Sequence, residues 1–110
     1  MRDAVIIEAA INGATTKARN PHVPISEDEL VADALACFEA GAAIVHHHIP
    51  GTGRSGADAA EVYLGVWRRV LAERPDALWY PTINIGPPER WYDHITPLAE
   101  SGMLRMTLSD

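Results

Sequence analysis

Short apolar runs and amphipathic segments alternate along the chain, beginning with a nearly continuous apolar run at residues 4–11. Further apolar runs follow at residues 42–48, 76–85 and 103–108. Apolar runs of this length are typical of strands that are buried on both faces. We therefore predict four strands, with Pro81 near the end of the third because proline has no N–H to donate to a sheet.

The first segment between these runs has the features of an amphipathic helix. Ser26 and Glu29 have the spacing of a capping box, in which each side chain accepts a hydrogen bond from the other residue's backbone N–H. Gly41 is placed to end the helix as the residue after its C-cap. The apolar residues of this helix fall on one face: Leu30, Val31, Ala34, Leu35 and Phe38.

Two further helices are predicted downstream. Asp58 and Glu61 repeat the capping spacing, and apolar residues at helical spacing follow them. A loop and a broken helix are predicted over residues 86–101. In the last segment of this helix we expect Thr96 as the N-cap and Pro97 in the first turn, where proline is tolerated.

The predicted order is therefore strand, helix, strand, helix, strand, helix, strand. Alternation of this kind produces right-handed βαβ units and a parallel sheet, which is an α/β fold. Four strands do not distinguish an open doubly wound sheet from part of a barrel. The sequence of 110 residues ends in a predicted strand and its first loop residues, so we expect it to be a portion of one longer domain.

Composition and charge narrow the classes of partner. Hydrophobic residues make up 47 % of the sequence and charged residues 22 %, which is typical of a soluble globular protein. The net charge of −6 argues against a nucleic-acid surface, and no apolar run approaches the roughly 18 residues of a membrane span. Cys37 is the single cysteine, and the N-terminus lacks the pattern of a signal peptide. We therefore expect a cytoplasmic protein without a nucleic-acid or membrane partner.

Three consecutive histidines end the second predicted strand. Because side chains alternate along a strand, His46 and His48 point to one face and His47 to the other. Two imidazoles at this spacing can share one zinc or similar ion at the carboxyl end of a strand, where parallel α/β folds bind ligands. The alternative is that they cap the strand end or are simply exposed. We expect His47, which would lie under a helix, to be structural.

Polar side chains also lie on or just after the other predicted strands. They are candidates for the same site, because the carboxyl ends of parallel strands meet at one edge of a sheet. The alternative is that hydroxyl and amide groups satisfy the backbone of nearby loops. Glu8 interrupts the first apolar run and is expected either near the site or bonded to a neighbour. The remaining candidates are Asn12, Thr15, Thr82, Asn84, Thr107 and Ser109.

Several stretches together resemble the β-keto acid cleavage enzymes and cover nearly the whole chain. The resemblance implies a (β/α)₈ TIM barrel of about 250 residues, with a divalent metal, usually zinc, at its carboxyl-end face. Residues 1–110 would then be the N-terminal portion of this single domain, with about the first three and a half βα units. The stretches that carry the resemblance are "AAINGA", "NPHVPIS", "EAGAAIVHHH" and "RWYDHITPLAESGMLRMTLSD".

The resemblance also implies roles for individual residues. His46 and His48 match the family's two histidine ligands, whereas its third ligand, a glutamate, and its catalytic aspartate and arginine would lie beyond Asp110. Thr82 matches a serine or threonine that contacts the keto acid. With the polar residues that share its face or its end of the sheet, it makes up the predicted substrate-binding set: Thr82, Asn84, Thr107, Ser109 and Thr15.

The chemistry implied by the resemblance is a Claisen-type acyl exchange. A β-keto acid and acetyl-CoA would give acetoacetate and a new CoA thioester, with the metal acting as a Lewis acid. The partners would be these two small molecules, with acetyl-CoA as co-substrate, and we expect the full-length enzyme to be a homo-oligomer. The activity is expected of the full-length protein rather than of these 110 residues alone.

Two departures from the family pattern bear on the substrate. The family usually follows its H-x-H motif with x-Arg-Asp, whereas this chain has Ile49, Pro50 and Gly51. Members that act on an amino-substituted keto acid carry an acidic residue where this chain has Thr15, which cannot pair with an ammonium group. We infer a substrate other than 3-keto-5-aminohexanoate, the amino-substituted keto acid that some members of the family cleave.

Two other classes of function remain open. Amidohydrolase-like metal hydrolases also use an H-x-H motif in a barrel, but theirs normally ends the first strand and this one ends the second. A truncated, inactive chain that binds only a metal or a partner is the non-enzymatic alternative.

Overall fold

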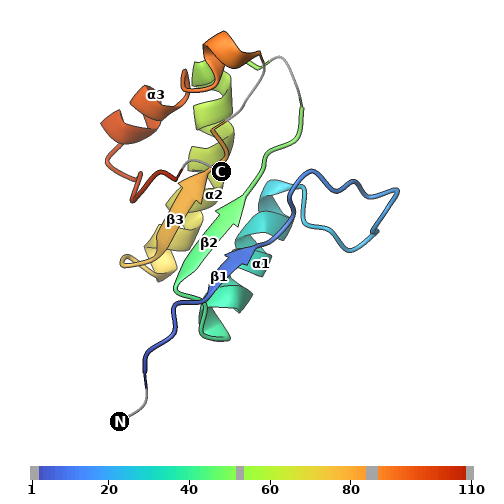
Figure 1. Ribbon diagram of the computed structural model, residues 1–110, viewed down its shortest axis with the longest axis vertical. Coiled ribbons are helices and arrows are strands. Elements are labelled where there is room, and N and C mark those ends of the chain that lie inside the picture. Colours follow the sequence, from blue (N-terminus) through green and yellow to red (C-terminus); the bar gives the residue numbers. More distant parts are fainter. Residues whose placement is uncertain (1–2, 52–53, 84–86, 109–110) are drawn as a thin grey trace.

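The computed structural model describes residues 3–51, 54–83 and 87–108. It consists of a small parallel sheet, two long helices packed against one face of it, and a short C-terminal helix (Figure 1). None of the helices in these ranges is long and apolar enough to cross a membrane. In chain order the elements are β1 (Glu8–Ala10), α1 (Glu27–Glu39), β2 (Ile44–His47), α2 (Gly56–Glu73), β3 (Leu78–Pro81), the 3₁₀ helix η1 (Pro88–Arg90) and α3 (Ile95–Glu100).

The sheet has three strands in the order β1-β2-β3, and both pairs are parallel. This confirms the predicted α/β class with a parallel sheet. His46 pairs with Ala10 on one side and with Tyr80 on the other, so the histidines end the central strand. Pro81 is the last residue of β3, as predicted, because no further ladder bond requires its missing N–H.

The apolar core lies between the sheet and the helices α1 and α2. Trp67 of α2 stacks on Trp79 of β3 with ring centroids 4.6 Å apart and an interplanar angle of 6°. Phe38 of α1 meets the edge of Trp67 at 6.4 Å, and Val45 of β2 is fully buried in the same cluster. The helices therefore cover the face of β2 that carries Val45 and His47, and the opposite face carries His46.

The start and the end of α1 are as predicted. Ser26 Oγ accepts a hydrogen bond from the Glu29 backbone N–H, and Glu29 Oε2 accepts one from the Ser26 N–H. The hydrogen bond from Lys17, with those from the Ile25 and Ser26 N–H groups, lowers the pKa of Glu29 to about 2. Gly41 follows the C-cap residue Ala40 with φ of 108°, a left-handed conformation that glycine adopts without steric cost.

The predicted starts of the next two helices were wrong. Ser55, not Asp58, caps α2, because its hydroxyl accepts a hydrogen bond from the Asp58 N–H and so places Asp58 in the first turn. His94, not Thr96, is the N-cap of α3, and Pro97 is its third residue. Proline is tolerated there because the first N–H groups of a helix have no partner within it.

The outer two predicted strands were also revised. The first is confined to Glu8–Ala10, and the apolar residues Val5, Ile6 and Ile7 before it are exposed. Residues 103–108 form no strand, because a strand requires a backbone partner along its length and this segment does not join the free edge of β3. Instead, the Met103 carbonyl accepts a hydrogen bond from the Trp79 indole.

His47 is structural, as predicted from its face of the strand. It is 0 % exposed, and its Nε2 accepts a hydrogen bond from Trp67 Nε1 at 3.0 Å. Because an indole N–H can only donate, the ring proton of neutral His47 must be on Nδ1, which donates to the His48 carbonyl at 3.0 Å. Burial, with smaller effects of the nearby His46 and His48, lowers the pKa of His47 to about 4.

We predict that this histidine makes the fold sensitive to mild acid. Because the folded-state pKa lies below the ordinary value of 6.5, the unfolded chain takes up the proton first as the pH falls. The stabilisation is complete above pH 6.5 and is lost between 6.5 and 4. Because of His47, the free energy of unfolding measured with urea should be about 1 kcal/mol lower at pH 5.5 than at pH 7.

Burial also lowers the pKa of His94, which acts in the same direction. The contributions of His47 and His94 are distinguished by following the titration of each imidazole by NMR. A His47 ring that titrates in the folded protein near its ordinary value would contradict the prediction.

Candidate functional site

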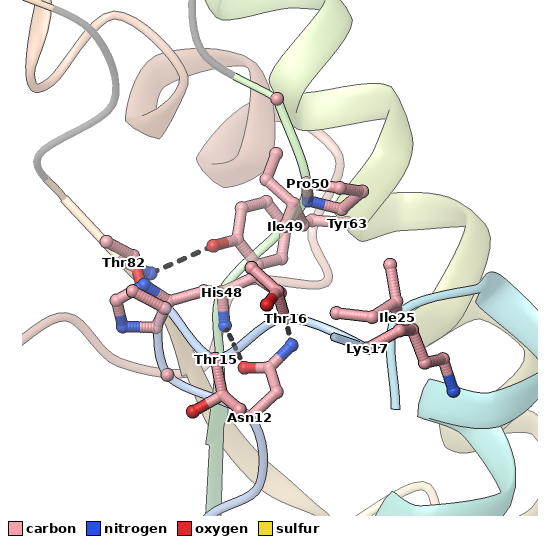
Figure 2. A pocket seen from close by; sticks show the side chains of 13 residues that line it. Asn12, Thr15, Thr16, Lys17, Ile25, His48, Ile49, Pro50, Tyr63 and Thr82 are labelled. Carbon is pink, nitrogen blue, oxygen red and sulfur yellow. Dashed lines mark hydrogen bonds between the residues drawn. The ribbon is translucent and has the colours of Figure 1, made fainter. Parts of the chain in front are cut away.

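The carboxyl ends of the three strands open into a cavity of about 760 Å³. Figure 2 shows the side chains that converge on it from the loop between β1 and α1, from the end of β2, from α2 and from the end of β3. The lining consists of residues 12–17, Ile25, residues 48–51, Tyr63 and Thr82. The cavity is therefore at the edge of the sheet where ligands bind in parallel α/β folds.

His46 and His48 lie side by side at this edge, on the face of β2 away from the helices. Their ring centroids are 5.2 Å apart and their planes are inclined by 75°. His46 is only 6 % exposed and stacks on Tyr80 of β3, with the ring centroids 4.3 Å apart. The strand alternation that predicted a shared face for the two rings is confirmed.

The hydrogen bonds of His46 suit it to a metal. Its Nδ1 lies 3.0 Å from the Tyr80 carbonyl, which can only accept, so Nδ1 carries the proton. The lone pair of neutral His46 is then on Nε2, which lies 3.4 Å from the Thr82 hydroxyl. A ring N–H held by a backbone carbonyl is the usual arrangement of a metal-binding histidine. Among the described residues, however, no group of three possible ligands occurs.

The Thr82 main chain is held on both sides. Its N–H donates to the Tyr63 hydroxyl at 3.0 Å, and the same hydroxyl donates to the His47 carbonyl at 3.1 Å. On the other side, His94 Nε2 lies 2.7 Å from the Thr82 carbonyl and donates to it. Tyr63 thus joins the ends of β2 and β3 beyond their last ladder pair, His47 with Pro81.

No role was predicted for Tyr63 or His94 from the sequence. A signal was present for Tyr63, since a tyrosine within the buried stripe of α2 needs a partner for its hydroxyl. Which partner it finds depends on the ends of two strands, and this cannot be seen from helical spacing. His94 gave no comparable signal, because it comes before a helix whose start was predicted two residues too late.

Glu8 is bonded to a neighbour, which was one of its two predicted alternatives. The Tyr80 hydroxyl donates a hydrogen bond to Glu8 Oε1 across the sheet. The Tyr80 ring also stacks on the ring of His46, so Glu8 helps to hold His46 in place through Tyr80. Glu8 itself is exposed and does not line the cavity.

Comparison with known proteins decides the family. The family model of the beta-keto acid cleavage enzymes matches residues 4–108. The chain belongs to this family. The resemblance that the sequence motifs suggested is thereby confirmed over almost the whole chain.

Curated relatives of this chain are named for several different activities. It is 32 % identical over 81 residues to the 3-keto-5-aminohexanoate cleavage enzyme of Acetoanaerobium sticklandii. It is also 32 % identical over 89 residues to the 3-dehydrocarnitine:acetyl-CoA trimethylamine transferase of Rhizobium meliloti, and 46 % identical over 50 residues to the 3-oxoadipate:acetyl-CoA acetyltransferase of Cupriavidus necator. These alignments cover 73 %, 78 % and 44 % of the chain.

The chain spans less than a third of the curated relatives it matches. The alignments cover 30 %, 29 % and 18 % of the three relatives in the same order.

The residues predicted for substrate binding in this family member separate into three groups. Thr15 and Thr82 line the cavity. Thr107 is exposed in the irregular C-terminal segment and does not line the cavity, because the strand that would have carried it does not form. Asn84 and Ser109 lie outside the described residues.

The charged lining of the cavity in this family member is already paired. Lys17 Nζ lies 2.6 Å from Glu29 Oε1 and also donates to the Pro21 carbonyl. Thr15 is uncharged, and the described lining contains no carboxylate. Beside Pro50, the Arg54 side chain folds back to donate from Nε to the Pro50 carbonyl at 3.0 Å.

Proposed function

We propose that the chain is the N-terminal part of an enzyme that exchanges the acyl group of a β-keto acid with acetyl-CoA. The products would be acetoacetate and a new CoA thioester. Membership of the family supports the general reaction, and two of the relatives have acetyl-CoA in their names. The observation that carries the proposal is the convergence of His46, His48 and Thr82 at the carboxyl edge of a parallel sheet.

The fold is consistent with the first units of a (β/α)₈ barrel. The three strands are parallel, α1 and α2 cover one face, and no described helix covers the face that carries His46. In a barrel, that face lines the interior and its carboxyl end carries the active site. We propose that residues C-terminal to this chain complete the barrel and supply the third metal ligand, a glutamate, and the catalytic aspartate and arginine.

His46 and His48 would hold the divalent metal, for which we propose zinc. When bound, such an ion supplies Lewis-acid polarisation of the keto and carboxylate oxygens of the substrate. Tyr80 keeps His46 in the tautomer that leaves Nε2 as the ligand atom. The Thr82 hydroxyl, fixed through its main chain by Tyr63 and His94, would donate a hydrogen bond to a substrate oxygen.

The cavity favours a keto acid without an ammonium group in its side chain. Thr15 has no charge, and the Lys17 ammonium is already occupied by Glu29. A cationic substrate side chain would therefore be desolvated here without a charged partner among the described lining residues. A neutral substrate side chain loses less hydration free energy on entering such a site.

The test is a thioester assay on the full-length protein that contains this segment. Acetyl-CoA is supplied with four keto acids: 3-oxohexanoate, 3-oxoadipate, 3-dehydrocarnitine and 3-keto-5-aminohexanoate. We expect acetoacetate and a new CoA thioester, with 3-oxohexanoate preferred over both cationic acids. If none of the four keto acids gives a CoA thioester, the assignment is wrong. Cleavage without acetyl-CoA would instead favour a hydrolase.

A further inference from the structure

Asn12 makes three hydrogen bonds through one buried side chain. Its Oδ1 accepts from the His48 N–H at 2.8 Å, and its Nδ2 donates to the His48 carbonyl at 2.9 Å. The same Nδ2 also donates to the Pro24 carbonyl at 3.2 Å. Figure 2 shows the Asn12 amide directed at the main chain of His48. Asn12 thus grips the peptide groups on both sides of the His48 Cα.

The position of His48 in the chain explains why such a grip is needed. Strand β2 ends at His47, so His48 lies just beyond the paired part of the sheet. The last backbone bond from the β1 side runs from the Ile11 N–H to the His46 carbonyl at 3.1 Å. In a regular parallel ladder the His48 N–H would next donate to the Ile11 carbonyl, but it donates to Asn12 Oδ1 instead.

An amide is the side-chain group suited to this place. It offers the acceptor and the donor that the next strand residues would present to His48, and a second donor that binds the Pro24 carbonyl. A carboxylate would put a second oxygen against the carbonyls of His48 and Pro24, and an apolar residue would remove one hydrogen bond from each of three backbone groups. The chain itself turns away directly afterwards, at Gly13 with φ of 55°.

We propose that Asn12 is a positioning residue for His48 as a metal ligand, an inference that rests on the proposed function. By holding the His48 main chain at both N–H and carbonyl, Asn12 keeps the ring at its observed 5.2 Å from that of His46. Through Pro24 it also ties the return of the loop that lines the cavity to the same point. Asn12 therefore fixes both the position of His48 beside His46 and the position of the loop that lines the cavity.

Zinc calorimetry on the full-length protein that contains this chain tests this role. Asn12→Ala is expected to weaken zinc binding about tenfold to a hundredfold, the range found when support of a metal ligand is lost. Asn12→Asp keeps the size and the acceptor for the His48 N–H, and should also weaken zinc binding by about tenfold, since its carboxylate faces two carbonyls. Val31→Ala, a core truncation in α1, controls for general destabilisation and should leave zinc affinity unchanged.

Backbone amide exchange gives a readout that needs no metal. In Asn12→Ala the His48 N–H should lose at least about tenfold in protection, beyond any change across the core in Val31→Ala, because its acceptor is gone. If zinc binds the unaltered chain and Asn12→Ala binds it equally well, the inference is overturned. Unchanged protection of the His48 N–H also overturns it.

The two proposals fail in different ways. Zinc binding that is absent from the unaltered full-length protein, or unaffected by removal of both His46 and His48, counts against the metal site of the proposed function. The amide exchange of His48 then still decides whether Asn12 holds that residue in place.

Discussion

Replacing both His46 and His48 with alanine should abolish specific zinc binding by the chain. The two rings lie on one face with their centroids 5.2 Å apart, and the bond to the Tyr80 carbonyl leaves Nε2 of His46 as a ligand atom. His46 and His48 are the two imidazole ligands proposed for this site, so their replacement removes both. Calorimetric titration with zinc, followed by metal analysis after dialysis, measures the loss.

Single variants and a distant histidine make this result specific. His46→Ala and His48→Ala should each weaken zinc binding by at least about tenfold, since a ligand matters no less than its supporting groups. His22→Ala removes an exposed histidine from the loop before α1 and should leave the affinity unchanged. Equal zinc content in the double variant and the unaltered chain would contradict the proposed metal site.

Replacing Trp67 with alanine should lower the free energy of unfolding by about 3–5 kcal/mol. Trp67 is 0 % exposed, stacks on Trp79 at 4.6 Å and contacts the ring of Phe38. Its loss would leave a cavity between α2 and the sheet that neighbouring side chains cannot fill. Because small domains are stable by only about 5–15 kcal/mol, this is a large fraction of the total. Urea unfolding at pH 7 measures it.

Trp67→Phe separates the hydrogen bond from the packing. Phenylalanine keeps much of the aromatic contact but removes the indole N–H that His47 Nε2 accepts. The buried acceptor is then unpaired, with an expected cost of about 1–3 kcal/mol. Tyr92→Ala, at a residue that is 60 % exposed, serves as control and should change stability by less than about 0.5 kcal/mol. A Trp67→Ala effect no larger than that of the control would contradict the packing argument.

Local rules account for the features that the sequence predicted correctly. The capping box of Ser26 and Glu29 and the left-handed Gly41 depend on residues a few positions apart, so their spacing is enough. The opposite directions of His46 and His47 follow in the same way from the two-residue period of a strand. The family motifs extend over nearly the whole chain and therefore also identified the family.

Features that depend on distant partners required the tertiary structure. The segment at residues 103–108 is apolar enough for a strand, yet it forms none, because a strand exists only where another backbone pairs with it. Tyr63, in the buried stripe of α2, joins the ends of β2 and β3 through a hydroxyl whose partners lie 16 and 19 residues away. Asn12 reaches His48 across 36 residues.

The sequence by itself therefore determined which histidines share a face and where α1 begins and ends. Both follow from periodicity and from capping within one element. Only the tertiary structure decided that Asn12, Tyr63 and His94 hold the main chains of His48 and Thr82 in place. The physical reason is that each strand ladder ends just before the site, and the unpaired backbone groups there take partners from side chains brought close by folding.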